Sequence, residues 1–534
     1  MLAPNDTQPN PNRKKRSWII FFVLICITVF LRIYRLSETL RFFDDQGMDM
    51  IILWHMEHMN HLPLVGPFLS LSNIFTPPTY YYITWFFYHI TGSITGIAYG
   101  YFILNIIGIG TLIKLAWDIG GQKTGLSMAI LLSISAVMVD HGRQFWQPYP
   151  MQVFLSLWLL FVWHAYTSKR VILLWIGITC FQIAFSVYPS PALLLICVGY
   201  QIYNWYHKNQ SNPSILRSLL QSLITFVSTF CIVFLPQIWF EITHHFPTWN
   251  TLITLVPTNT GISHPLLHIG QNVYGLFASF FATASLPSFF MPFFTIVIVI
   301  FTYIFVTSRA INTKLSPLFT PWTIFAGLFL LLLYPYDIHP HRMWTFLPLL
   351  FLIFALMITH AFSKISYLTY GITLLLCIYI TTNIIMVTSY IRTTPSKSMQ
   401  SSAMIAHAIQ NDMTKRDITQ TSVGLFYKIP NDLKNGSYGI YKIAYWLLTS
   451  NTFTLPLTSN GNMMQLDYSN PVFTPYMYIV CEGFLSSKSA YKQCVQPTIQ
   501  QYPYKTLDII TIDTSSIFVL FTDVLSLQTP VQNE

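Results

Sequence analysis

Long apolar runs recur along this chain from Trp18 to about Met386, and they constrain its fold more than any other feature. Apolar runs long enough to cross a hydrocarbon core of about 30 Å recur along this part of the chain. Only 9% of the 534 residues are charged, whereas about a quarter are charged in soluble proteins. The pattern predicts a polytopic α-helical membrane protein with about eleven transmembrane helices. Residues 1–392 form the predicted membrane module, and the more polar residues 393–534 form a C-terminal soluble domain.

The first apolar run, Trp18–Leu31, follows a basic patch at residues 13–16. No small-residue cleavage site comes after it, so we expect a retained anchor helix whose N-terminus is cytoplasmic. The further predicted spans are Ile97–Trp117, Thr124–Val139, Met151–Tyr166, Val171–Val187, Leu193–Trp205, Leu219–Phe240, Ser288–Val306, Leu318–Tyr334, Met343–His360 and Tyr367–Tyr390.

The charge of the loops supports this topology, because every loop placed on the cytoplasmic side is basic. The residues concerned are Lys114, Lys123, Lys169, Arg170, Lys208, Arg217, Arg309, Lys314 and Lys364. An odd number of spans places the first outer loop, residues 35–96, and the C-terminal domain together on the extracytoplasmic face of the cell membrane. The net charge of +9 reflects this topology, and no pattern indicates a nucleic-acid partner. The chain also has neither a P-loop nor a Gly-rich dinucleotide fingerprint.

The apolar and aromatic segment from Pro77 to Thr91 is predicted to be an interfacial or re-entrant helix. Counting it as a span would reverse every later loop and put the basic loops outside. Its run Tyr80-Tyr81-Tyr82 is typical of an aromatic belt at the head groups. The alternative is a groove for a lipid chain, in which Tyr81 contacts the substrate.

The C-terminal domain is predicted to be mixed α/β. Its pattern indicates helices at Ser402–Met413 and Ile440–Leu448 and strands at Val423–Ile429, Met477–Cys481, Leu507–Ile512 and Ile517–Phe521. Five of the seven cysteines lie in predicted spans. The remaining two, Cys481 and Cys494, lie outside, where a disulfide between them is consistent with an oxidising compartment.

Charged residues on the predicted outer face are the candidates for chemistry. The acidic pair Asp44-Asp45 follows the first helix. Arg143 and Arg342 are unexpected on this face, because positive residues next to membrane helices favour the cytoplasmic side. Three histidines accompany them, namely His141, His339 and His341. The alternative for each arginine is a residue that snorkels to lipid phosphate, and the alternative for Asp44 is the N-cap of a helix.

This set of residues fits the departure of a sugar from phosphate. Phosphate is a weak base, so cations can stabilise it as it leaves and no protonating acid is needed. A single carboxylate then suffices as general base on an acceptor hydroxyl, and attack from the opposite face inverts the anomeric carbon. We expect Asp44 to be this base and Asp45, Arg143, His339, His341 and Arg342 to bind substrate.

A histidine run follows the acidic pair, with His55, His58 and His61 spaced three residues apart. Neighbouring members of this run share a helix face, a spacing that can hold a divalent metal. The alternative is the polar face of an interfacial helix.

Three short motifs, in their order along the chain, resemble those of the GT-C membrane glycosyltransferases. The resemblance is to the branch with protein O-mannosyltransferases, lipid A aminoarabinose transferases and RgtA/B/C/D-like enzymes. The motifs are Phe43-Asp44-Asp45-Gln46, Pro77-Pro78-Thr79-Tyr80-Tyr81 and His341-Arg342-Met343-Trp344. The family pair is commonly Asp-Glu, whereas the second member here is Asp45, and the following Gln46-Gly47 also departs from the family pattern.

This resemblance implies a polyprenyl-phosphate-linked sugar as donor and an acidic base in the first outer loop, which by position is Asp44. It leaves open whether the acceptor is a lipid, a polysaccharide or a protein. The alternative function is a transporter or flippase of lipid-linked sugars, which needs the outer cations but no base. Such proteins commonly show paired broken helices in two halves, and the sequence shows no internal symmetry.

Overall fold

The computed structural model describes most of the membrane module and the core of the C-terminal domain. The described residues are 11–60, 62–67, 74–209, 215–258, 265–282, 302–303, 305–329, 340–361, 367–392, 399–417, 423–428, 440–449, 476–482, 495–496, 505–512 and 515–521. The chain divides into two compact units, Met1–Leu36 with Pro63–Thr393 and Ser37–Leu62 with Thr394–Glu534. This grouping differs from the two sequence ranges, because it joins residues 37–62 to the C-terminal residues.

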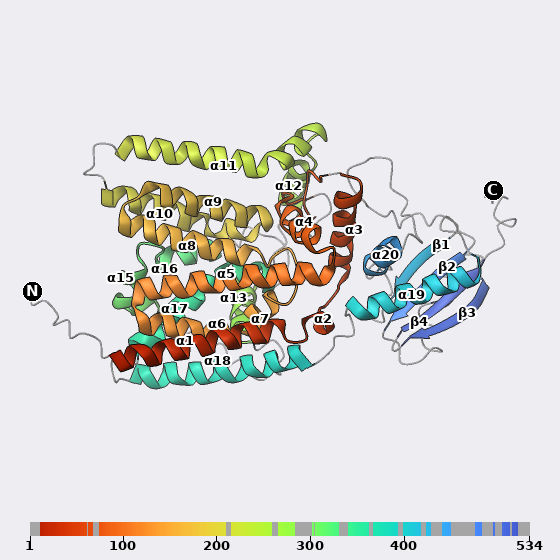
Figure 1. Cartoon of the computed structure of the whole chain (residues 1–534). Coiled ribbons are helices and arrows are strands. Elements are labelled where there is room, and N and C mark those ends of the chain that lie inside the picture. The colour runs from red at the N-terminus through yellow and green to blue at the C-terminus, as the bar shows by residue number, and fades with distance from the viewer. Residues whose placement is uncertain are drawn as a thin grey trace, which may run out of the picture. The chain divides into compact units, whose positions relative to one another are not determined.

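The first unit consists mainly of helices, and its long helices run side by side in Figure 1. Its helices include α1 (Pro11–Ile33), α4 (Thr79–Thr91), α5 (Ile94–Gly120), α6 (Gln122–Ile134), α7 (Ala136–His141), α8 (Met151–Ser168), α9 (Val171–Val187), η1 (Ser190–Leu194), α10 (Leu195–Asn209) and α11 (Ile215–Thr243). They continue with α12 (Pro247–Thr258), α13 (Pro265–Phe280), α15 (Arg309–Leu315), α16 (Pro321–Phe329), η4 (Pro340–Phe346), α17 (Leu347–Ala361) and α18 (Tyr367–Arg392).

Within the described residues, four helical segments are long and apolar enough to cross a membrane. These segments are Ile94–Gly120, Leu223–Thr243, His341–Ala361 and Thr369–Arg392, while Ile19–Ile33 and Val171–Val187 are shorter apolar helices. The total of about eleven spans stays a prediction. The predicted span Ser288–Val306 lies mostly outside the described residues.

The predicted span Thr124–Val139 is interrupted at Ser135, which ends α6 and begins α7. The Ser135 hydroxyl accepts a hydrogen bond from the amide of Met138. The amide of Ala136, which loses its helical partner at the break, donates to Asn383 Oδ1 at 2.6 Å. Side chains therefore satisfy the backbone groups that the break releases, as an apolar interior requires.

The segment after Pro77 is the 13-residue helix α4. At a rise of 1.5 Å per residue, a helix of this length is about 20 Å long, too short to span a bilayer. Tyr80 and Tyr81 are buried in the first unit, at 0% and 2% exposure. The aromatic-belt interpretation is therefore wrong for these two rings, because a belt residue faces the lipid head groups.

The second unit contains a four-stranded sheet with the strand order β1-β2-β4-β3. Its elements are α3 (Asp44–His58), α19 (Met399–Lys415), β1 (Val423–Lys428), α20 (Ile440–Thr449), β2 (Tyr476–Glu482), β3 (Lys505–Ile512) and β4 (Ser515–Phe521). Strands β1 and β2 are parallel, whereas β4 is antiparallel to both β2 and β3. The pairing places Tyr478 beside Val519 and Val480 beside Ile517.

The core of this unit lies between the sheet and the two helices α19 and α20. Alternate residues of a strand share one face, and Tyr478, Val480, Ile517 and Val519 are all buried on the face that packs against these helices. The Tyr478 hydroxyl donates to Asp412 Oδ2 of α19 at 2.9 Å. Cys481 of β2 is disulfide-bonded, and the predicted partner Cys494 lies outside the described residues.

Candidate functional site

Asp44, the predicted base, is the first residue of α3 and binds the beginning of a second helix. Its Oδ1 accepts a hydrogen bond of 2.8 Å from the backbone amide of Tyr441, the second residue of α20. The first amides of a helix have no partner within it, so this carboxylate supplies one. The alternative that Asp44 caps α3 itself is wrong, because Phe43 holds that position and its amide donates to Gln46 Oε1.

The close approach of α3 and α20 depends on Gly47, one turn after Asp44. A Cβ at this position would overlap the backbone of Tyr441 and Lys442. Asp44 and Gly47 are three residues apart and therefore lie on one face of α3. Asp45 is exposed in the first turn, while Asp49, which the sequence analysis did not single out, is 1% exposed.

The histidines that follow lie at the end of α3. The Nδ1 atoms of His55 and His58 lie 2.7 Å and 2.9 Å from the carbonyl oxygens of Ile51 and Trp54, one turn earlier. The His58 ring also stacks on Trp54. His61 lies outside the described residues, and within those residues no group of three His, Cys, Asp or Glu side chains could hold a metal ion.

Arg143 is only 2% exposed within the first unit. Its Nη1 donates to the carbonyl of Leu31 in α1 at 2.9 Å. The snorkelling alternative is therefore wrong for Arg143, because a snorkelling guanidinium reaches the membrane surface.

Arg32 is a second buried arginine, just beyond the first apolar run Trp18–Leu31. It lies within α1 at 0% exposure. Its Nε donates to Asn105 Oδ1 at 2.7 Å, and its two Nη atoms donate to backbone carbonyls. The carbonyls belong to Thr28, Leu132 and Ser133. Its positive charge lies at the predicted extracytoplasmic end of the first helix. Positive residues next to membrane helices favour the cytoplasmic side, and both Arg32 and Arg143 depart from this preference.

His141 and His341 lie in one aromatic cluster. The ring centroid of His141 is 4.4 Å from that of Tyr149 and 4.6 Å from that of Trp344. His341 lies 4.8 Å from Trp146 and 6.0 Å from Trp344. Arg342, the next residue along η4, is half-buried. His339 lies outside the described residues.

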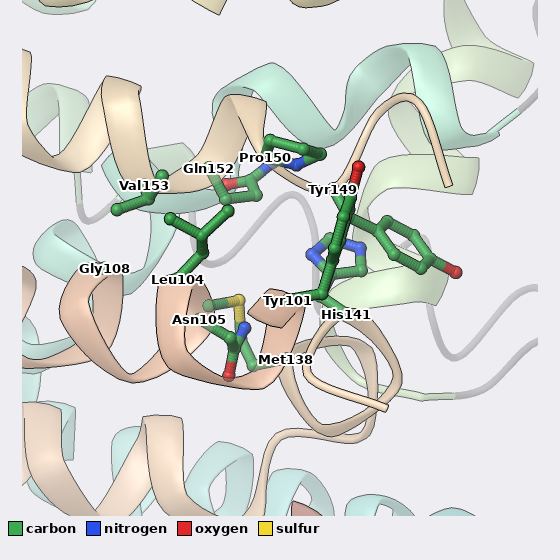
Figure 2. Close-up of a pocket in the computed structure, with 10 residues that line it drawn as sticks. All are labelled: Tyr101, Leu104, Asn105, Gly108, Met138, His141, Tyr149, Pro150, Gln152 and Val153. Atoms are coloured by element: carbon green, nitrogen blue, oxygen red, sulfur yellow. The ribbon is translucent and has the colours of Figure 1, made fainter. Parts of the chain in front are cut away.

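A small pocket adjoins this cluster, with a cavity volume of about 10 Å³. Figure 2 shows the side chains of Asn105, His141 and Gln152 around it, contributed by α5, α7 and α8. The remaining lining residues are Tyr101, Leu104, Gly108, Met138, Tyr149, Pro150 and Val153.

His141 is a titratable group of the pocket with a shifted pKa, and it lies beyond the predicted span 124–139. Burial, and after it the positive charge of Arg32, lowers the pKa of His141 to about 3. The ring is therefore neutral at physiological pH, with one donor nitrogen and one acceptor nitrogen.

Several buried polar atoms at the pocket have no hydrogen-bond partner within the described part of the chain. They are both ring nitrogens of His141, Oε1 of Gln152 and Nε1 of the adjacent Trp344. Gln152 is held by its other end, since its Nε2 donates to the Trp344 carbonyl at 2.8 Å. The pocket therefore presents fixed donors and acceptors on aromatic and apolar walls, which is the usual character of a ligand site.

Neither a family model nor a curated protein matches the chain. Among solved structures, it is similar to ArnT from Cupriavidus metallidurans in the apo state, with 10% identity and a TM-score of 0.52 over 97% of this chain and 100% of that chain. It is also similar to the same ArnT bound to undecaprenyl phosphate, with 11% identity and a TM-score of 0.53 over 94% and 98%. ArnT is a lipid A aminoarabinose transferase with the GT-C fold. The likeness confirms the GT-C fold that the motifs predicted.

Proposed function

We propose that this protein is a membrane glycosyltransferase that moves a sugar from a polyprenyl-phosphate-linked donor to an acceptor hydroxyl. The observation that carries the proposal is the likeness to ArnT over nearly the full length of both chains. One of the two similar structures holds undecaprenyl phosphate, which motivates the choice of donor. Fold likeness supports function only by analogy. Substitutions of individual residues therefore test the proposal.

In the proposed reaction, Asp44 accepts the proton of the acceptor hydroxyl as its oxygen attacks the anomeric carbon of the sugar. The bond between that carbon and the phosphate oxygen breaks, and the electron pair stays on polyprenyl phosphate. Attack from the face opposite the leaving group inverts the anomeric centre. The Tyr441 amide supports this role for Asp44 because it orients the carboxylate.

Cations near the leaving phosphate stabilise its growing negative charge. We assign this role to Arg342 and His341, which are half-buried and therefore accessible in part. Buried Arg143 adds positive charge in the same unit. Asp45, His339 and Tyr81 remain proposed substrate contacts.

The proposed location is the plasma membrane, with a cytoplasmic N-terminus and an extracytoplasmic C-terminal domain. Basic loops on one predicted side support the orientation of the helices. The disulfide at Cys481 supports an oxidising environment for the C-terminal domain.

Sugar transfer in membranes that contain the protein tests the proposed base. The assay compares labelled polyprenyl-phosphate sugars with the wild type, Asp44→Asn and Asp44→Ala. Asparagine keeps an oxygen that accepts from the Tyr441 amide, whereas alanine removes both the base and this hydrogen bond. We expect Asp44→Asn to fold normally and to lower transfer by at least about a hundredfold, since general-base catalysis contributes about 10²–10⁴-fold.

Asp118→Asn is the matched control, because Asp118 pairs with Lys114 and His164 in a predicted cytoplasmic region. We expect it to transfer sugar at the wild-type rate. If Asp44→Asn also kept the wild-type rate while Asp44→Ala lost stability, Asp44 would be a helix cap and not the base.

A further inference from the structure

The pocket between α5, α7 and α8 has a hydrogen-bonding pattern that specifies the chemistry of its ligand. The Gln152 amide is fixed by its bond to the Trp344 carbonyl, so its Oε1 faces the ligand as an acceptor. Neutral His141 offers one donor and one acceptor. A buried polar atom without a partner destabilises the protein, so a bound group that both donates and accepts stabilises this site.

A hydroxyl group meets that requirement and a phosphate does not. The oxygens of a phosphate only accept, so an anion placed here would face the acceptor Oε1 of Gln152 and be repelled by it. The three nitrogens of nearby Arg32 already donate to Asn105 and to backbone carbonyls, so its positive charge acts on the pocket only at a distance.

The adjoining aromatic cluster supplies the second half of a sugar-binding surface. Trp146 and Trp344 are half-buried, so part of each side chain is accessible. The faces of aromatic rings carry partial negative charge, and the carbon-bound hydrogens of a sugar ring carry partial positive charge. A sugar that packs on these rings can place one hydroxyl in the pocket beside His141.

We infer that the pocket around Asn105, His141 and Gln152, with the aromatic cluster beside it, is the subsite that recognises the glycosyl unit of the lipid-linked donor. This inference rests on the proposed function and adds to it the residues that select the sugar. His141 and Gln152 bind one sugar hydroxyl, and Trp146 and Trp344 contact the sugar ring.

Two substitutions test the subsite in the full-length protein. His141→Phe keeps an aromatic ring between Tyr149 and Trp344 but removes both nitrogens. Gln152→Met removes the acceptor and keeps most of the side-chain volume. The matched control is Gln201→Met, because Gln201 is equally buried but both ends of its amide are bonded within the protein, to Trp158 and Leu318.

The measurement is the dissociation constant of two lipids, polyprenyl phosphate bearing the sugar that the wild type transfers and polyprenyl phosphate alone. We expect His141→Phe and Gln152→Met to weaken binding of the sugar-bearing lipid by about tenfold. Binding of the bare lipid should stay within about twofold of the wild type, and Gln201→Met should leave the ratio of the two constants unchanged.

Donors that each lack one sugar hydroxyl give a readout that does not depend on protein stability. For each protein, binding of the deoxy donor is compared with binding of the complete donor by that same protein. The wild type should discriminate against one such deoxy donor, and His141→Phe should not. Two outcomes overturn the subsite even when the wild type transfers sugar. One is that the variants bind both lipids equally more weakly than the wild type does. The other is that binding of neither lipid weakens, as expected if the pocket holds only ordered water. Failure of the wild type to transfer any sugar overturns the proposed function itself.

Discussion

At the scale of single residues, burial and after it the positive charge of Arg32 keep His141 of the pocket neutral. The hydrogen-bond acceptors of Arg32 in the described part of the chain are an amide oxygen and backbone carbonyls, all of them neutral. A buried cation of this kind disfavours a second positive charge nearby. His141 therefore stays neutral and keeps the acceptor nitrogen that binding a hydroxyl requires.

The pKa of His141 leads to a prediction about stability. Since its pKa is lowered from 6.5 to about 3 in the folded state, the unfolded chain binds a proton in this pH window that the folded chain does not. Stability is fully present above pH 6.5 and falls as the pH is lowered, by up to about 1.4 kcal/mol per pH unit from this group. Thermal unfolding in detergent from about pH 7 to about pH 5 measures the loss.

His141→Phe is the comparison for that experiment, because phenylalanine does not titrate. The variant should lose less stability than the wild type over the same pH range. Identical pH dependence in the two proteins would mean that the pKa of His141 is the same in the folded and unfolded states and is not lowered by folding.

Sequence alone identified Arg143 and His141 but not the role of Arg32. Arg143 and Arg342 stood out because they lie far from any predicted cytoplasmic loop. The first apolar run ends at Leu31, whereas α1 continues to Ile33 and includes Arg32. Its burial depends on Asn105 and on carbonyls at residues 132 and 133, contacts between distant segments that no local pattern reveals.

At the scale of elements, the packing of α3 on α20 depends on the missing side chain of Gly47. Gly47→Ala should force the two helices apart, because the added Cβ meets backbone atoms of α20 that cannot rotate away. We expect a loss of about 1–3 kcal/mol of stability, as for other overpacked sites. We also expect reduced sugar transfer, because the bond from the Tyr441 amide to Asp44 lengthens.

Gly110→Ala is the matched control, since Gly110 is a helical glycine of α5 with no atom within 4 Å of an added Cβ. It should be neutral or stabilising by up to about 1 kcal/mol. The midpoint temperatures of thermal unfolding of both variants measure these effects. Equal midpoints for Gly47→Ala and Gly110→Ala would show that α3 and α20 do not pack closely.

Helices and strands could be predicted from the sequence where one local hydrophobic pattern determines their secondary structure and bounds. The span Val171–Val187 has the bounds of α9, and the four predicted strands overlap β1 to β4. The break at Ser135 was not predictable, because serine is tolerated within helices. The break is stabilised by Asn383, more than two hundred residues away in the chain.

At the scale of the whole molecule, the two compact units are both discontinuous in sequence. The segment 37–62 packs with the C-terminal residues through Phe42, whose ring lies 6.2 Å from Tyr445 and 6.5 Å from Trp446. The amide of Met399 also donates to the Leu40 carbonyl at 3.1 Å. Sequence ranges miss such an arrangement, because hydropathy separates polar from apolar segments but does not show which polar segments pack together.

The proposed function makes the catalytic carboxylate part of the unit that contains the C-terminal residues. Asp44 is oriented by α20, so an intact C-terminal domain is needed for transfer as well as for stability. A flippase of lipid-linked sugars would place no such demand on Asp44, because moving a lipid needs no general base.

The most direct test uses the purified protein in vesicles with a polyprenyl-phosphate donor whose sugar and lipid are both labelled. For a glycosyltransferase, we predict that sugar appears on the acceptor and that free polyprenyl phosphate appears in equal amount. Both products should be nearly abolished in Asp44→Asn. Donor that crosses the bilayer with its sugar still attached, in the wild type and in Asp44→Asn alike, would contradict the account and identify the protein as a flippase.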